Sequence, residues 1–213
     1  RVKIPFKGNI KKLMTDLDFS EAENLPKGKK KPYHFQLVVN PYNIGGGIYC
    51  SIMYKKKYSK NYTKPSVLVD GYIPGDESIA VLSKLTLAVN KTIPILMNQL
   101  IKSQYPTNDE PIVGTHAEIF SNTELQGKLL SCAICVDMKD AKKILDLFLV
   151  FNNIEGPFAG LVAFRFLKGT NATLGFTKFE NSCVFELDGL FNDHTRKFCL
   201  EFTNLLMERD IYQ

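Results

Sequence analysis

The sequence has few histidines, no long apolar run and only a mild net charge. Its three histidines, at 34, 116 and 194, support no Ser/His/Asp order for nucleophilic catalysis. No apolar stretch approaches the roughly 20 residues of a membrane span, and none has the charged start and small-residue cleavage site of a signal peptide. The net charge of +5 over 213 residues is far from the basic stripe left by phosphate-backbone binding. These absences disfavour a triad hydrolase, a membrane-spanning protein and a nucleic-acid-binding protein.

The cysteines also lack a functional spacing. There are five, an odd number without the regular intervals of a disulfide scaffold. Cys132 and Cys135 read CAIC inside the apolar run LLSCAICVDM, whereas a thioredoxin-type pair would open a helix. No second pair or nearby histidine completes the set of about four ligands that zinc needs. We therefore expect reduced buried thiols and no metal, and these thiols favour a cytoplasmic location.

The glycine and lysine clusters fit turns and solvent-exposed segments, and one of the lysine clusters also allows a binding role. The glycine triplet at 45–47 lacks both the G-x-G-x-x-G context of a dinucleotide site and the lysine of a P-loop, which favours a flexible turn. The lysine clusters KGKKK (27–31) and YKKKYSKNY (54–62) fit a solvated loop and a protected strand end. The second cluster also interleaves lysine with tyrosine. A non-enzymatic binding module that grips an acidic partner with 54–62 is therefore the alternative function.

The first half of the chain predicts a linker followed by a hairpin and helices. A composition of 45% hydrophobic and 23% charged residues is that of a soluble globular protein. Residues 1–31 read as an N-terminal linker or edge segment, and the start at Arg1 suggests a piece of a longer polypeptide. Residues 32–213 form the main domain. Its first elements are expected as strands over 33–40 and 48–58, a helix from 76 or 78 that Pro94 breaks, and a helix through PILMNQLIKSQY.

In the second half, the order of strands and helices is easier to predict. The hydrophobic periodicity predicts a strand over 128–138, a helix over 139–153, strands over 159–168 and 182–189, and a helix over 193–210. This ferredoxin-like strand-helix-strand-strand-helix order predicts an α+β fold. We expect an antiparallel sheet with helices covering one face.

Three charged residues interrupt the two apolar strands of the expected hairpin. Side chains alternate along a strand, so Arg165 shares a face with Glu186 and Asp188, in a register that places Arg165 opposite Glu186. One interpretation is a cross-strand ion pair in partial solvent, worth about 0.2–1 kcal/mol. The other is a ligand platform, to which the polar face of the first hairpin would add His34, Gln36 and Asn40.

A resemblance favours the platform. The segment GLVAFRFLKGTNATLGFTKFENSCVFELDG (160–189) has a strand with an arginine, a loop rich in Gly, Thr and Leu, and the motif SCVFELDG. It resembles the substrate (cap) domain of FAD-dependent oxidoreductases of the vanillyl-alcohol oxidase type, which include sugar-lactone oxidases, alditol oxidase and a covalent-flavin cholesterol oxidase. HFQLVVNPYN (34–43) is similar to an early cap strand of that family.

The resemblance implies a cap domain of an FAD-linked oxidase or dehydrogenase acting on a CH–OH group. A separate FAD-binding domain of the parent polypeptide, absent from this chain, would hold the cofactor, so this fragment alone would be silent. By resemblance, Arg165 faces flavin and substrate as a catalytic and cofactor-binding residue, and Glu186 orients it or contacts substrate. The substrate-binding set for a small alcohol or sugar-like molecule would be His34, Gln36, Asn40 and Asp188.

The chain departs from the family at one position. Several relatives carry a Glu-x-Arg pair on this strand, and here the position two before Arg165 is Ala163. An acid/base role at that position therefore does not transfer. Either Glu186 or His34 replaces it, or the chemistry differs.

Overall fold

The computed structural model describes part of the chain, and its second half is the continuous part. The described residues are 2–6, 34–43, 48–53, 84, 90–104, 114–115 and 129–209. Several sequence predictions fall outside them: both lysine clusters, the glycine triplet at 45–47, and most of the helix expected from 76 or 78.

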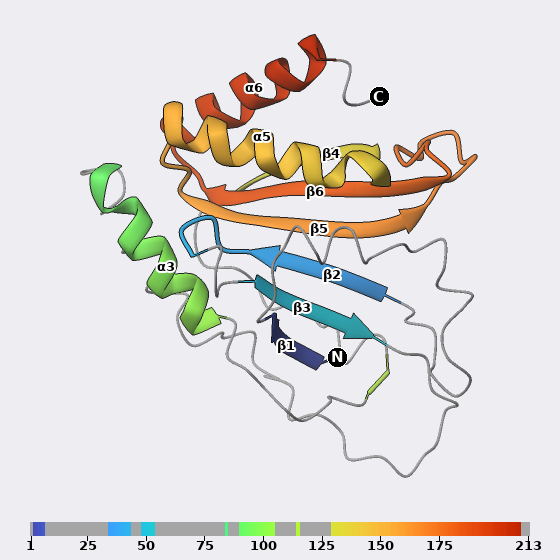
Figure 1. Ribbon diagram of the computed structural model, residues 1–213, viewed down its shortest axis with the longest axis horizontal. Coiled ribbons are helices and arrows are strands. Elements are labelled where there is room, and N and C mark those ends of the chain that lie inside the picture. The colour runs from blue at the N-terminus through green and yellow to red at the C-terminus, as the bar shows by residue number, and fades with distance from the viewer. Residues whose placement is uncertain are drawn as a thin grey trace.

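Six described strands form one antiparallel sheet (Figure 1). In chain order they are β1 (Val2–Phe6), β2 (His34–Val39), β3 (Ile48–Met53), β4 (Leu129–Asp137), β5 (Gly160–Lys168) and β6 (Asn181–Leu190). Their order across the sheet is β1-β3-β2-β5-β6-β4, and every neighbouring pair is antiparallel. The first hairpin therefore joins the sheet of the second through β2 and β5, as the platform interpretation requires.

The helices begin where the local sequence favours a helix start. They are α3 (Ile93–Gln104), α5 (Ala141–Ile154) and α6 (Asp193–Glu208), with 3₁₀ turns at Asn90–Thr92 and Met138–Asp140. Pro94 lies in the first turn of α3, where a missing N–H is not needed. The Asn192 side chain caps α6 by accepting a hydrogen bond from the Thr195 N–H at 2.7 Å.

The predicted α+β class and the element order of the second half are confirmed. The segment runs β4, α5, β5, β6, α6, with bounds within two residues of those expected from hydrophobic periodicity. Side chains alternate in direction along the strands, and the helices carry apolar stripes. These two patterns were enough to predict the type and the bounds of each element in this segment.

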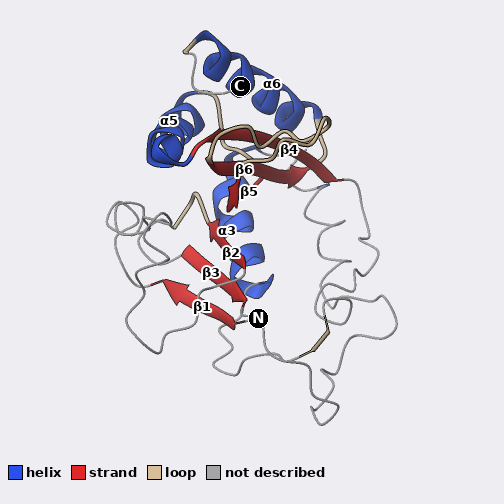
Figure 2. Cartoon of the chain, turned by 90° about the vertical axis from the view of Figure 1, so that its right-hand side faces the viewer, coloured by secondary structure: helices blue, strands red, loops and turns tan. Residues whose placement is uncertain are grey.

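One face of the sheet carries the aromatic core. Figures 1 and 2 show α5 and α6 together on one side of β4, β5 and β6. Phe148 of α5 is fully buried at the centre of this core. Its ring meets four others nearly edge-on, with centroids 5.8–5.9 Å away: Phe158, Phe185, Phe198 and Phe202. Such contacts add to the stability given by burial.

The predicted cover of one face is confirmed by α5 and α6, and α3 partly covers the opposite face as well. Ile93, Met97 and Ile101 of α3 pack against Val38 of β2 and Ala163 of β5. Val38 and Ala163 lie opposite each other across the β2–β5 pair, on the face of Arg165. They give this end of the charged face an apolar surface, and α3 buries it.

Candidate functional site

Arg165 and Glu186 form an ion pair on the second face of the sheet. Nη2 of Arg165 lies 2.9 Å from Oε2 of Glu186. The predicted common face is confirmed, but the predicted register is wrong. Arg165 is opposite Val184, and Glu186 is opposite Ala163, so the two charges are diagonal neighbours. A shift of two residues keeps every side chain on its face, so hydrophobic alternation cannot distinguish the two registers.

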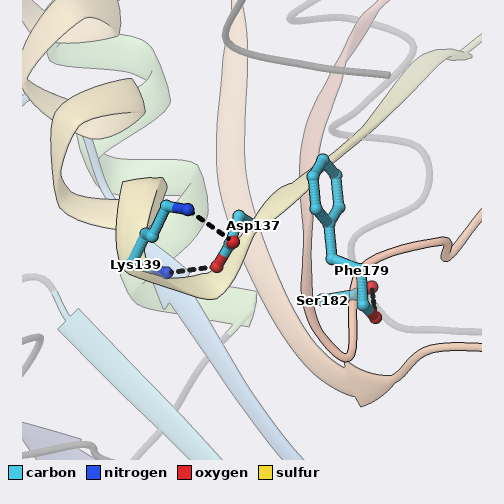
Figure 3. A network of polar contacts seen from close by, with 4 residues as sticks. All are labelled: Asp137, Lys139, Phe179 and Ser182. Atoms are coloured by element: carbon cyan, nitrogen blue, oxygen red, sulfur yellow. Dashed lines mark hydrogen bonds and ion pairs between the residues drawn. The ribbon is translucent and has the colours of Figure 1, made fainter.

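Hydrogen bonds at the strand ends accompany the observed register. The Gly169 N–H donates to the Glu180 carbonyl at 3.0 Å, closing the β5–β6 loop next to the Lys168–Asn181 pair. At the same end of β6, the Ser182 hydroxyl donates to the Phe179 carbonyl at 2.9 Å (Figure 3).

The end of β4 lies beside the start of β6, and contacts between Asp137 and Lys139 hold it in place. Asp137, opposite Ser182 in the β4–β6 register, accepts a hydrogen bond from the Lys139 N–H at 3.1 Å and pairs with its Nζ at 2.9 Å (Figure 3). The turn into α5 therefore starts from a defined strand end.

The two members of the ion pair differ in solvent exposure. The Arg165 side chain is 45% exposed, whereas that of Glu186 is 11% exposed. Oε2 of Glu186 is buried and makes no hydrogen bond to the residues that the structure describes, so its contact with Arg165 is an ion pair without hydrogen-bond geometry. Glu186 therefore depends on the arginine charge for compensation, while Arg165 keeps part of its guanidinium available to a ligand.

Burial raises the pKa of Glu186 above its ordinary value. Loss of hydration is the largest cause; the positive charge of Arg165 acts against it, and the negative charge of Asp188 adds to it. A carboxyl group with a raised pKa can exchange a proton closer to neutral pH than an exposed glutamate.

Gln36, Asp188 and Ser131 extend the charged face. Gln36 of β2 lies opposite Arg165, as the sheet arrangement predicted. The Ser131 hydroxyl donates to Oδ1 of Asp188 at 2.6 Å, across the β4–β6 pair. Sequence reasoning missed Ser131. Ser131 lies in the half of β4 where exposed and half-buried side chains alternate, and this alternation was the available signal that it is exposed. Only the pairing of β4 with β6 places it beside Asp188.

Of the other two predicted substrate-binding residues, Asn40 is buried away from the ion pair and His34 has no described side chain. Asn40 is buried, donates to Oδ1 of Asn98 at 2.8 Å, and accepts from the Tyr42 N–H at 3.0 Å. These bonds tie the end of β2 to α3 and to the following turn. His34 begins β2 opposite Met53, but its side chain lies outside what the structure describes.

The cysteines with described side chains are free thiols. Cys135, Cys183 and Cys199 are buried, and Cys132 is half-buried. The CAIC pair lies within β4, not at a helix start. Within the described ranges, no group of three or more His, Cys, Asp and Glu residues is placed to hold a metal ion. None of the helices that the structure describes combines the length and the apolar character needed to cross a membrane.

Replacing Glu186 with glutamine is expected to remove a pH dependence of stability. An unfolded glutamate titrates at about pH 4.3, and the pKa of Glu186 in the fold is higher. Between the two values the folded state binds more protons, so its free energy of unfolding falls as pH rises. The stability of the wild type relative to Glu186→Gln should therefore be greatest below about pH 4 and should decline through that window.

Urea unfolding of the wild type and of Glu186→Gln between pH 3.5 and 8 measures this difference in the free energy of unfolding. Far-UV circular dichroism follows the unfolding. Glu155→Gln, the same change at an exposed position, gives the background. A difference between wild type and Glu186→Gln that rises with pH would contradict the expectation, because it would mean that the charged form is favoured in the fold.

Comparison with known proteins identifies no family. No protein-family model matches the chain, and no curated protein matches it significantly. The arrangement of the site residues is therefore the main basis for a functional assignment.

Proposed function

We propose that this chain is the substrate-binding cap domain of an FAD-linked oxidase or dehydrogenase acting on a CH–OH group. The face that carries Arg165 would close over the flavin, which a separate FAD-binding domain holds. The observation that carries the proposal is the asymmetric ion pair: a nearly buried Glu186 holds a half-exposed Arg165 on a sheet face. The resemblance of residues 160–189 to such cap domains supports it.

The residues of this face fit a flavin and an alcohol substrate. When bound, the flavin would accept a hydride from the substrate carbon. Arg165, fixed on one side by Glu186, would present positive charge to a developing alkoxide or to anionic reduced flavin. Because the pKa of Glu186 is raised, this carboxylate is suited to accept the hydroxyl proton that the missing acid at Ala163 does not take.

The neighbouring polar groups suit a substrate with several hydroxyls. Gln36 lies opposite Arg165, and the hydrogen-bonded Ser131 and Asp188 lie on β4 and β6. Amide, hydroxyl and carboxylate groups on one face can donate to and accept from the hydroxyls of a small alcohol or sugar-like molecule. With its free thiols, this enzyme is proposed to act in the cytoplasm.

The visible absorbance of the polypeptide that naturally carries residues 1–213 tests the proposal. We expect a flavin spectrum that bleaches under anaerobic conditions when a member of an alcohol and sugar panel is added. Bleaching reports hydride transfer from the substrate to the flavin, and readmission of oxygen or of an artificial acceptor should restore the colour.

A polypeptide that is colourless and stays so after incubation with FAD would overturn the assignment. Salt-sensitive binding to an acidic protein would then support the alternative module, provided that the binding disappears when Lys55, Lys56 and Lys57 are changed to glutamate. In that case Arg165 and Glu186 would be an ordinary ion pair.

A further inference from the structure

Two thiols from distant parts of the chain meet on the helix-covered side of the sheet, away from the charged face. Cys132 of β4 faces the turn of α6 that carries Cys199 and Thr203, because its Sγ lies 3.7 Å from Oγ1 of Thr203, four residues along the helix from Cys199. Cys132 is half-buried, whereas Cys199 is buried within the aromatic core. The accessible member of the pair is therefore on the strand, and the protected member is on the helix.

A hydroxyl group completes the cluster. Oγ1 of Thr203 lies 3.7 Å from Sγ of Cys132 and donates to the carbonyl of Cys199 at 2.7 Å. A hydroxyl has one hydrogen, so in this arrangement its oxygen faces the Cys132 thiol as an acceptor. If Cys132 loses its proton, the same hydroxyl can rotate and donate to the thiolate.

The pKa values of the two thiols are shifted in opposite directions. The Cys199 side chain lowers the pKa of Cys132 to about 6; burial acts against this, and Thr203 lowers the pKa as well. The pKa of Cys199 is raised, first by the Cys132 side chain, then by burial and by the negative charges of Cys132 and Asp188. A thiolate is the form that attacks a disulfide, so Cys132 is the member prepared to react.

We infer that Cys132 and Cys199 form a thiol–disulfide couple, with Cys132 as the attacking thiol and Cys199 as the resolving thiol. The oxidant is a low-molecular-weight disulfide of the glutathione class. The Cys132 thiolate attacks one sulfur of that disulfide, forms a mixed disulfide and releases one thiolate. The Cys199 thiol then gives up its proton and attacks Sγ of Cys132, releasing the second small thiol. In sum, two protein thiols and one small disulfide yield one protein disulfide and two small thiols.

The structure gives the second step a physical reason. Formation of the mixed disulfide removes the negative charge of Cys132, which is one of the causes of the raised pKa of Cys199. Cys199 then becomes easier to deprotonate next to its target. The product would join α6 covalently to β4, two elements that lie in contact.

The other described cysteines provide an internal contrast. Cys135 is buried on the opposite face of β4, three residues from Cys132. Cys183 is buried in β6, and burial raises its pKa strongly. Both are therefore less accessible to a small disulfide than the half-buried Cys132.

The test exposes the reduced full chain to oxidised glutathione at neutral pH and identifies the products by intact mass and peptide mapping. The wild type should lose about two mass units by forming the Cys132–Cys199 disulfide. Cys199→Ser should accumulate one glutathione adduct at Cys132, and Cys132→Ser should form neither product. Cys135→Ser, on the same strand, should behave as the wild type.

A wild-type product at any other cysteine, or a Cys199→Ser protein without an adduct at Cys132, would overturn the inference. Because a change at the buried Cys199 could disturb folding, a second measurement uses the wild type alone. A brief pulse of iodoacetamide should label Cys132 at least 10-fold faster than Cys135 or Cys183. Equal labelling rates would contradict an activated Cys132.

Discussion

Replacement of Arg165 with alanine is expected to slow substrate-driven bleaching of the flavin by about 100- to 1000-fold, the range found when one charge-stabilising donor is removed from an active site. The expectation rests on the proposed cap function. The guanidinium is half exposed on the charged face, and Glu186 holds it from one side. Its loss would leave the developing negative charge of the substrate or flavin without its positive neighbour. Anaerobic stopped-flow absorbance of the parent polypeptide measures the rate.

Two controls separate this effect from damage to the fold. Arg165→Lys keeps the positive charge but not the planar, forked donors, and should fall between wild type and alanine. Lys168→Ala removes an exposed positive charge from the same strand and should leave the rate within about 3-fold. A rate for Arg165→Ala within 3-fold of the wild type would reduce the ion pair to a structural feature.

The largest loss of stability is expected for Phe148→Ala, about 3–5 kcal/mol in the free energy of unfolding. The Phe148 ring is fully buried and meets rings from α6, β6 and the segment that leads into β5. Truncation removes these contacts and leaves a cavity that surrounding phenylalanines, held by two helices and the sheet, cannot fully close. Urea denaturation monitored by far-UV circular dichroism gives the change.

Leu200→Ala is the matched control, because Leu200 lies on α6 but is 58% exposed. Its effect should stay within about 0.5 kcal/mol, as for other surface changes. If Phe148→Ala unfolds the chain outright, Phe148→Leu retains most of the volume and should still cost more than Leu200→Ala. Equal losses for Phe148→Leu and Leu200→Ala would show that the aromatic core does not govern stability.

The fold of residues 129–209 was predictable because each element carries a strong local signal. In β5 and β6, side chains that face the aromatic core alternate with side chains of the other face, and α5 and α6 each have one apolar stripe. The positions of the strand ends follow from the same patterns. The common face of Arg165, Glu186 and Asp188 needed only the period of two, and the structure confirms it.

Other features depend on contacts between distant segments. Nothing local to β4 indicates that Ser131 would meet Asp188, since that contact requires the β4–β6 pairing. The sequence around Asn40 likewise does not reveal that Asn98, 58 positions away, would accept its hydrogen bond. The same holds for Cys132 and Cys199, which meet only because α6 packs on the sheet next to β4.

By itself, the sequence determined the α+β class, the element order of the second half and the face on which its charges lie, because these follow from periodicities within single segments. The tertiary structure decided the two-residue offset between Arg165 and Glu186, the placement of α3 on the charged face, and the burial that raises the pKa of Glu186. The physical reason is the range of the interactions. Alternation is written into neighbouring residues, whereas register, helix docking and desolvation are settled by the packing of segments far apart in the chain.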